Sequence, residues 1–152
     1  LHSFPTRRSS DLSEYQKAGK GYVVASVGKE SGEIPYTAFM ASKSYIEKNA
    51  ELLEKFLTAI QKAIKYLDET DKSTVAKSIA KQFPGTDVGS VTDSLESYLS
   101  IDAWTKNTAM TEEAFNNLQS VMENAGELDK RADYNAIAYN DIAEKVYKKI
   151  YA

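Results

Sequence analysis

The stretch GYVVASVGKESGEIPYTAFMAS, residues 21–42, carries the β-strand signal of this sequence. Residues 21–28 form a short run rich in β-branched side chains between two glycines, and residues 36–42 form a second apolar run. The residues between them are polar, include Gly32 and end with Pro35. Short apolar runs bounded by turn residues are typical of buried strands. The stretch therefore predicts two strands joined by a turn.

Amphipathic helices are predicted for the rest of the chain. Apolar side chains recur at helical spacing from Leu53 to Leu67, and Asn49 stands where an N-cap residue is expected. Pro84 and Gly85 are expected to stop a helix that begins near Ser73. Further helices are predicted over about residues 42–46, 87–99, 111–126 and 140–150.

Two strands are too few to form the sheet that this series of helices would need to cover. Two strands do not make a stable sheet alone, and amphipathic helices need an apolar surface to cover. This order predicts that the chain is the C-terminal part of a larger α/β protein whose remaining strands lie elsewhere.

The first twelve residues, LHSFPTRRSSDL, have neither the spacing of a helix nor the alternation of a strand. They lack an initiator Met and hold the only histidine, His2, and two of the three arginines. The run resembles a translated sequencing-adaptor remnant, so we predict that residues 1–12 are an artefact and disordered. A polar N-terminal arm is the alternative.

The composition of the remaining 140 residues excludes several kinds of site. Without residues 1–12 the net charge changes from −3 to −4, and the chain has no His, no Cys and a single arginine, Arg131. Imidazole and thiol catalysis, and the usual zinc ligands, are therefore not expected. Mild acidity with mixed charges argues against nucleic-acid binding. No apolar run is long enough to span a membrane.

A family resemblance rests on residues 21–67. A strand, a turn with Gly32, Pro35, an apolar strand, a Ser-led turn and the sequence Asn49-Ala50-Glu51 opening a long helix follow in that order. This order resembles the ABC-transporter solute-binding proteins of the nitrate, sulfonate and taurine type. The family more often has Pro at the position of Ala50. The resemblance extends over nearly all of residues 21–150.

The resemblance implies an α/β, periplasmic-binding-protein-like (type II) fold with two lobes, of which this chain would be a truncated, mostly helical C-terminal part with two strands. Residues 13–32 would end the second lobe. Residues 33–152 would form the crossing strand between the lobes and the C-terminal helices of the first lobe.

The family also implies where a solute would bind. The crossing segment is the candidate for contact, with Glu33 as an acceptor, Tyr36 as a stacking surface and Thr37 as a hydroxyl donor. The alternative is a hinge turn with exposed polar groups. Trp104 is a further candidate for the pocket wall, although a packing residue at a helix end is the commoner role. Arg131 is expected to be a solvated loop residue.

The resemblance implies a non-enzymatic solute receptor that closes around a small organic or anionic solute and delivers it to ABC permease subunits. We expect no cofactor and no metal, a monomer when full length, and a periplasmic or membrane-anchored, lipoprotein-like location. A freestanding helical interaction module is the main alternative. A pyrimidine-precursor synthase of thiamine biosynthesis is a further one, but it would require histidines that residues 13–152 lack.

Overall fold

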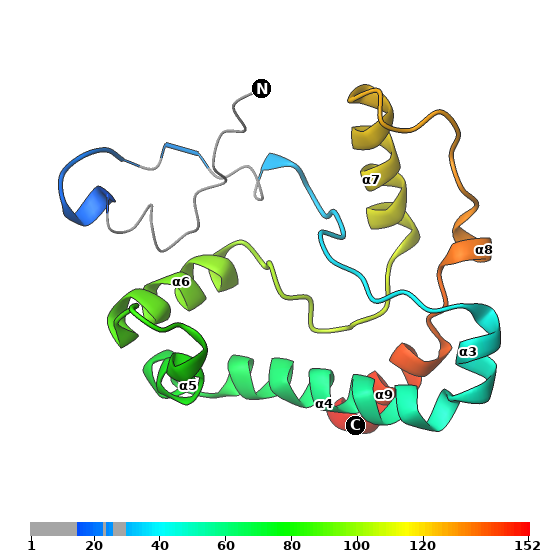
Figure 1. Ribbon diagram of the computed structural model, residues 1–152, viewed down its shortest axis with the longest axis horizontal. Coiled ribbons are helices and arrows are strands. Elements are labelled where there is room, and N and C mark those ends of the chain that lie inside the picture. The colour runs from blue at the N-terminus through cyan, green and yellow to red at the C-terminus, as the bar shows by residue number, and fades with distance from the viewer. Residues whose placement is uncertain (1–14, 23, 26–29) are drawn as a thin grey trace. The chain divides into compact units, whose positions relative to one another are not determined.

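The computed structural model describes residues 15–22, 24–25 and 30–152, and helices are the regular elements of this part of the chain (Figure 1). The helices that lie wholly within residues 31–152 are α3 (Lys43–Lys48), α4 (Ala50–Glu69), α5 (Lys72–Ile79), the 3-10 turn η1 (Ala80–Gln82), α6 (Val88–Ser100), α7 (Glu112–Asn124), α8 (Tyr134–Ile137) and α9 (Asp141–Tyr151).

The predicted α/β fold with two strands is wrong for the described residues, which contain no strand. Residues 33–41 are irregular and lead into α3, and the described members of the first predicted strand, residues 21–22 and 24–25, are irregular too. Residues 23 and 26–28 of that strand lie outside the described part. A strand needs a neighbour to pair its backbone groups. Residues 33–41 make no backbone–backbone hydrogen bond with any described residue. The type II two-lobed architecture is therefore not what the structure shows.

The helices begin where short polar side chains can cap them. The side chains of Ser42, Asp71, Asp87 and Thr111 each accept a hydrogen bond from the backbone N–H three residues later. Such a cap satisfies one of the amides that a helix leaves without an internal partner. The predicted helix starts at residues 42, 87 and 111 are confirmed.

Two helix boundaries differ from the expectation. Asn49 ends α3 rather than capping α4 with its side chain, because its Nδ2 donates to the Tyr45 carbonyl at 2.9 Å. The helix before Pro84 tightens into a 3-10 turn after Ile79 instead of running to Phe83. Proline restricts the residue before it to non-helical conformations, and Phe83 has φ −123° and ψ 63°.

The described residues divide into two compact units. The first is made of the described residues before Ser31 together with Tyr66–Trp104, and the second is made of Ser31–Lys65 and Thr105–Ala152. In the first unit α5 packs on α6. Their buried apolar residues are Val75, Ala76, Val91 and Leu95, and half-buried Leu67, Ile79, Val88 and Trp104 pack against them. Lys72 closes the preceding helix, since its ammonium donates to the carbonyls of Leu67, Asp68 and Thr70.

The second unit buries polar as well as apolar side chains. Phe115 of α7 and Val146 of α9 are buried, and so is Gln61 in the middle of α4. The Gln61 Nε2 donates to the Lys106 carbonyl at 2.5 Å and lies 3.5 Å from the Tyr151 hydroxyl. Gln61 therefore links α4 to the segment that follows Thr105 and to the end of α9.

Candidate functional site

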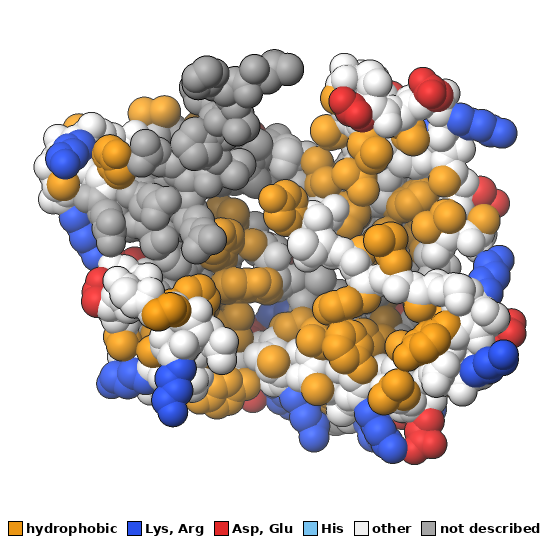
Figure 2. Space-filling model, in the orientation of Figure 1, with side chains coloured by type: hydrophobic (Ala, Val, Ile, Leu, Met, Phe, Trp, Pro, Cys, Tyr) orange, Lys and Arg blue, Asp and Glu red, His pale blue; other side chains and the backbone are white. Residues whose placement is uncertain are grey.

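The predicted solute-contact residues Glu33, Tyr36 and Thr37 lie in the irregular segment of the second unit, and all three are exposed. Tyr36 is 95% exposed and Met40 is 94% exposed, so their apolar groups face solvent. Ile34 and Pro35 are half-buried. The segment thus presents a carboxylate, a phenol ring and a hydroxyl outward while its Ile34–Pro35 pair lies inward. Figure 2 shows hydrophobic side chains at the molecular surface.

Two contacts attach this segment to helices. The Nδ2 of half-buried Asn117, on α7, donates to the Glu33 carbonyl at 3.2 Å. The ring of Phe39 meets the ring of Phe56, on α4, edge to face with centroids 4.8 Å apart. The candidate contact residues Tyr36 and Thr37 therefore lie between two attachment points, both within the second unit.

The predicted site residue Trp104 belongs to the first unit, whereas Glu33, Tyr36 and Thr37 belong to the second. Its ring lies 5.3 Å from the ring of Tyr98, centroid to centroid, and it packs against the buried residues of α5 and α6. Trp104 has a packing role here, and its predicted place at a pocket wall stays a prediction.

Arg131 is held by side chains of α7. Its guanidinium donates to Glu123 Oε2 at 2.6 and 2.9 Å and to the Ser120 hydroxyl at 2.8 Å. The hydrogen bond from Arg131 lowers the pKa of Glu123, and the same bond raises the pKa of Arg131. These bonds fasten the loop after α7 to that helix and occupy the fork that would otherwise suit an anion.

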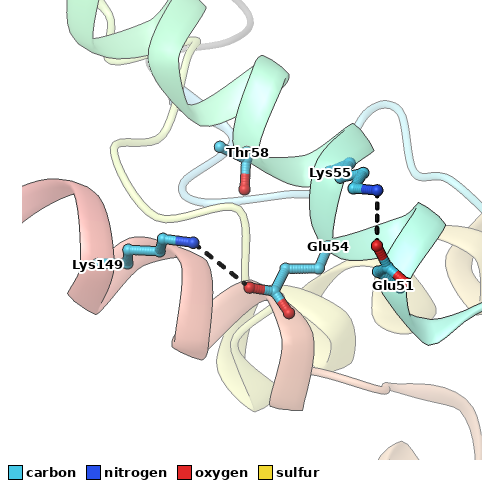
Figure 3. Close-up of a pocket in the computed structure, with 5 residues that line it drawn as sticks. All are labelled: Glu51, Glu54, Lys55, Thr58 and Lys149. Atoms are coloured by element: carbon cyan, nitrogen blue, oxygen red, sulfur yellow. Dashed lines mark hydrogen bonds and ion pairs between the residues drawn. The ribbon is translucent and has the colours of Figure 1, made fainter.

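A shallow surface pocket lies where α4 meets α9 (Figure 3). Its lining residues are Glu51, Glu54, Lys55, Thr58 and Lys149. Glu54 of α4 points toward α9, where Lys145 donates to it at 2.6 Å and Lys149 lies 3.7 Å away. The hydrogen bond from Lys145 is the main cause that lowers the pKa of Glu54.

The charges of this pocket satisfy one another. Lys55 pairs with Glu51 one turn earlier on α4, at 2.6 Å, and Glu54 pairs with the two lysines of α9. The arrangement attaches α9 to α4 and gives each carboxylate of the pocket a lysine partner.

Sequence reasoning did not find Asn117 or the Lys145–Glu54 pair. Neither has a local signal, because Asn117 lies on a helix whose sequence pattern marks only the apolar face, and Lys145 and Glu54 are 91 residues apart.

Among the described residues, no three His, Cys, Asp or Glu side chains are grouped so that they could hold a metal ion. In the same residues, every helix is too short or too polar to cross a bilayer.

Comparison with known proteins gives one curated relative. The chain is 37% identical over 132 residues to a protein of Bacillus subtilis (strain 168) named "Putative binding protein YtlA". The match covers 87% of this chain and 40% of that protein, so the chain spans about two fifths of the relative's length. No family model matches the chain, and no solved structure matches it.

Proposed function

We propose that this chain is part of a solute-binding protein that serves an ABC importer. The observation that carries the proposal is the 37% identity, over most of this chain, to a protein named as a binding protein. That name supports a binding role rather than an enzymatic one. The order of Gly32, Pro35, Ser42 and Asn49-Ala50-Glu51 before a long helix supports the finer assignment to the nitrate, sulfonate and taurine type of solute receptor.

The segment from Glu33 to Thr37 is the proposed contact surface for the solute. It offers three complementary groups within five residues: a carboxylate that accepts from an amine, a ring that stacks on a planar or apolar body, and a hydroxyl that donates or accepts. All three side chains are exposed, so a solute reaches them without rearrangement of the segment.

The proposed partners follow from the transport role. The solute-loaded protein would dock on permease subunits outside the cytoplasmic membrane, in the periplasm or anchored to the membrane surface. The Nε and Nη2 groups of Arg131 are already bound by Glu123 and Ser120, so this fork of the guanidinium is not free for an anionic solute. Any clamp for an anion would therefore come from other residues of the protein.

The proposal is tested by a solute screen. The protein expressed from its whole reading frame in the source DNA would be heated with a panel of sulfonates, nitrate, amines and pyrimidines while its unfolding is followed. A bound solute stabilises the folded state and raises Tm in a concentration-dependent way. We expect Tm to rise with solutes of one chemical class in the panel. A flat response to every class would count against the solute-receptor role.

A further inference from the structure

We propose that Asn117 and Phe56 are positioning residues that hold the solute-contact segment, residues 33–39, ready for binding. This inference rests on the proposed function for its consequence and on the structure for its geometry. Neither residue belongs to the segment itself, and neither is placed here in contact with a solute.

The first attachment fixes the start of the segment. Asn117 is half-buried on α7, a regular helix capped by Thr111, so its side chain is presented from a rigid element. Its Nδ2 donates to the main-chain carbonyl of Glu33 rather than to the side chain. A bond to the main chain holds the backbone in place and leaves the Glu33 carboxylate available to a ligand.

The second attachment fixes the end of the segment. Phe56 lies on α4 and meets Phe39 edge to face, with ring centroids 4.8 Å apart, which is a favourable arrangement for two aromatic rings. Phe39 is nevertheless 75% exposed, so most of its surface faces solvent and the ring of Phe56 covers one edge of it.

The residues between the attachments have little else to hold them. Residues 33–41 make no backbone–backbone hydrogen bond with another described residue. Pro35 fixes its own φ and restricts Ile34, which stiffens the centre of the segment. Two end contacts and one proline together limit the conformations of Tyr36 and Thr37. Ordering a flexible segment on binding costs about 1–2 kcal/mol per residue of backbone entropy, so a segment that is held beforehand binds more tightly.

The first test needs no solute. Chymotrypsin cleaves after aromatic residues, and it requires a stretch of chain that can become extended and mobile. We would compare Asn117→Ala and Asn117→Asp with the unchanged chain and measure, by mass spectrometry, the cleavage rate after Tyr36 and Phe39. Asn117→Asp keeps the size of the side chain and replaces the donor with an acceptor. Asn124→Ala, which removes another amide from the same helix, is the matched control.

We expect both Asn117 variants to be cut faster after Tyr36, and the Asn124→Ala protein to be cut like the unchanged chain. Equal cleavage rates for all proteins would overturn the inference about positioning and would leave the proposed function standing. Phe56→Leu, which keeps an apolar contact but removes the edge-to-face ring pair, should give the same acceleration after Phe39.

The second test uses the solute class found in the thermal screen. We expect Asn117→Ala to lower its affinity about 2- to 12-fold, the change that corresponds to the net contribution of one neutral hydrogen bond, with the ranking of solutes unchanged. An unchanged affinity together with faster cleavage would show that the segment is held but does not bind solute. Absence of binding by the unchanged protein would refute the proposed function, while the cleavage rates still decide the positioning.

Discussion

Asn140 shows how a single side chain joins two segments of the second unit. Its Oδ1 accepts from the Met110 N–H at 3.0 Å, and its Nδ2 donates to the Met110 carbonyl at 2.9 Å and to the Tyr134 hydroxyl at 2.8 Å. The amide therefore pairs with both backbone groups of Met110, as a neighbouring strand would. The sequence predicts a helix over about residues 140–150 and carries no sign of this pairing. Asn140 precedes α9, but its side chain makes no cap bond there.

Replacing Asn140 should therefore destabilise the second unit. We expect Asn140→Ala to lower the free energy of unfolding by about 1–3 kcal/mol, because the half-buried Met110 N–H loses its partner, while the Met110 carbonyl keeps only the bond from the Tyr134 hydroxyl. Urea denaturation would measure the change. Asn135→Ala, an exposed residue of α8, serves as control and should change stability by under about 0.5 kcal/mol. Equal effects of the two substitutions would contradict the pairing role.

Asp87 makes the folding stability of the first unit depend on pH. The Ser90 hydroxyl donates to this carboxylate at 2.6 Å and the Ser90 N–H donates at 3.0 Å, and these bonds lower the pKa of Asp87. A carboxyl whose pKa is lower in the folded state stabilises the fold above its unfolded pKa, and that contribution is lost as the pH falls through the folded pKa.

We predict that acid unfolding of the first unit depends on this cap. Asn caps helices about as well as Asp but does not titrate. Asp87→Asn should therefore leave Tm near neutral pH almost unchanged and make the fall in Tm between about pH 5 and pH 2 shallower. Asp129→Asn removes a carboxylate that caps no helix and is the control. An unchanged slope for Asp87→Asn would show that the cap does not contribute to the acid transition.

Gln61 marks a limit of what the sequence shows at the residue scale. Helical spacing predicts an inner face of α4, and its members are half-buried except Phe56, which is 40% exposed; they are Leu53, Phe56, Leu57, Ile60, Ile64 and Leu67. Gln61 lies on the same helix and is fully buried, although a glutamine among apolar residues is normally assigned to solvent. Its burial depends on the Lys106 carbonyl, which is 45 residues away. No local pattern contains that information.

At the scale of elements, helices were predictable and strands were not. A helix makes its backbone hydrogen bonds within itself, and its caps lie in the adjoining sequence, so Ser42, Asp87 and Thr111 mark real helix starts. A strand depends on a neighbour elsewhere in the chain. Residues 36–42 have the apolar composition of a strand, but the described residues supply no strand beside them. Their Tyr36, Phe39 and Met40 side chains are consequently exposed.

The contact of α5 with α6 should carry most of the stability of the first unit. Leu95 of α6 is 7% exposed and belongs to the buried cluster with Val75 and Val91. We expect Leu95→Ala to cost about 2–5 kcal/mol, because the cavity would be lined by apolar groups on both helices. Leu52→Ala is the matched control, since Leu52 of α4 is 54% exposed.

Thermal and urea denaturation would separate the two substitutions. Leu95→Ala should lower both the midpoint and Tm, and Leu52→Ala should leave both close to the unchanged protein. If Leu95→Ala had no larger effect than Leu52→Ala, the α5–α6 cluster would not be the stabilising core of this unit.

At the scale of the whole molecule, the sequence predicted a binding role better than it predicted an architecture. The relative named as a binding protein supports the role, whereas the described residues form helices in two compact units rather than a two-lobed α/β protein. The candidate site divides in the same way. Glu33, Tyr36 and Thr37 lie in one segment because they are neighbours in sequence, but Trp104 joins the other unit. Its packing against α6 is a long-range property that spacing does not reveal.

The central claim is that this protein binds a small solute through the segment from Glu33 to Thr37. The most direct measurement is calorimetric titration of the solute class from the thermal screen into the unchanged protein, Tyr36→Ala and Tyr139→Ala. Tyr139 is an exposed tyrosine outside the segment and serves as control. We predict saturable binding to the unchanged protein and to Tyr139→Ala, and at least about tenfold weaker binding to Tyr36→Ala, since a stacked ring contributes on the order of 1–3 kcal/mol. Equal affinities for the two variants, or no binding by the unchanged protein, would contradict the claim.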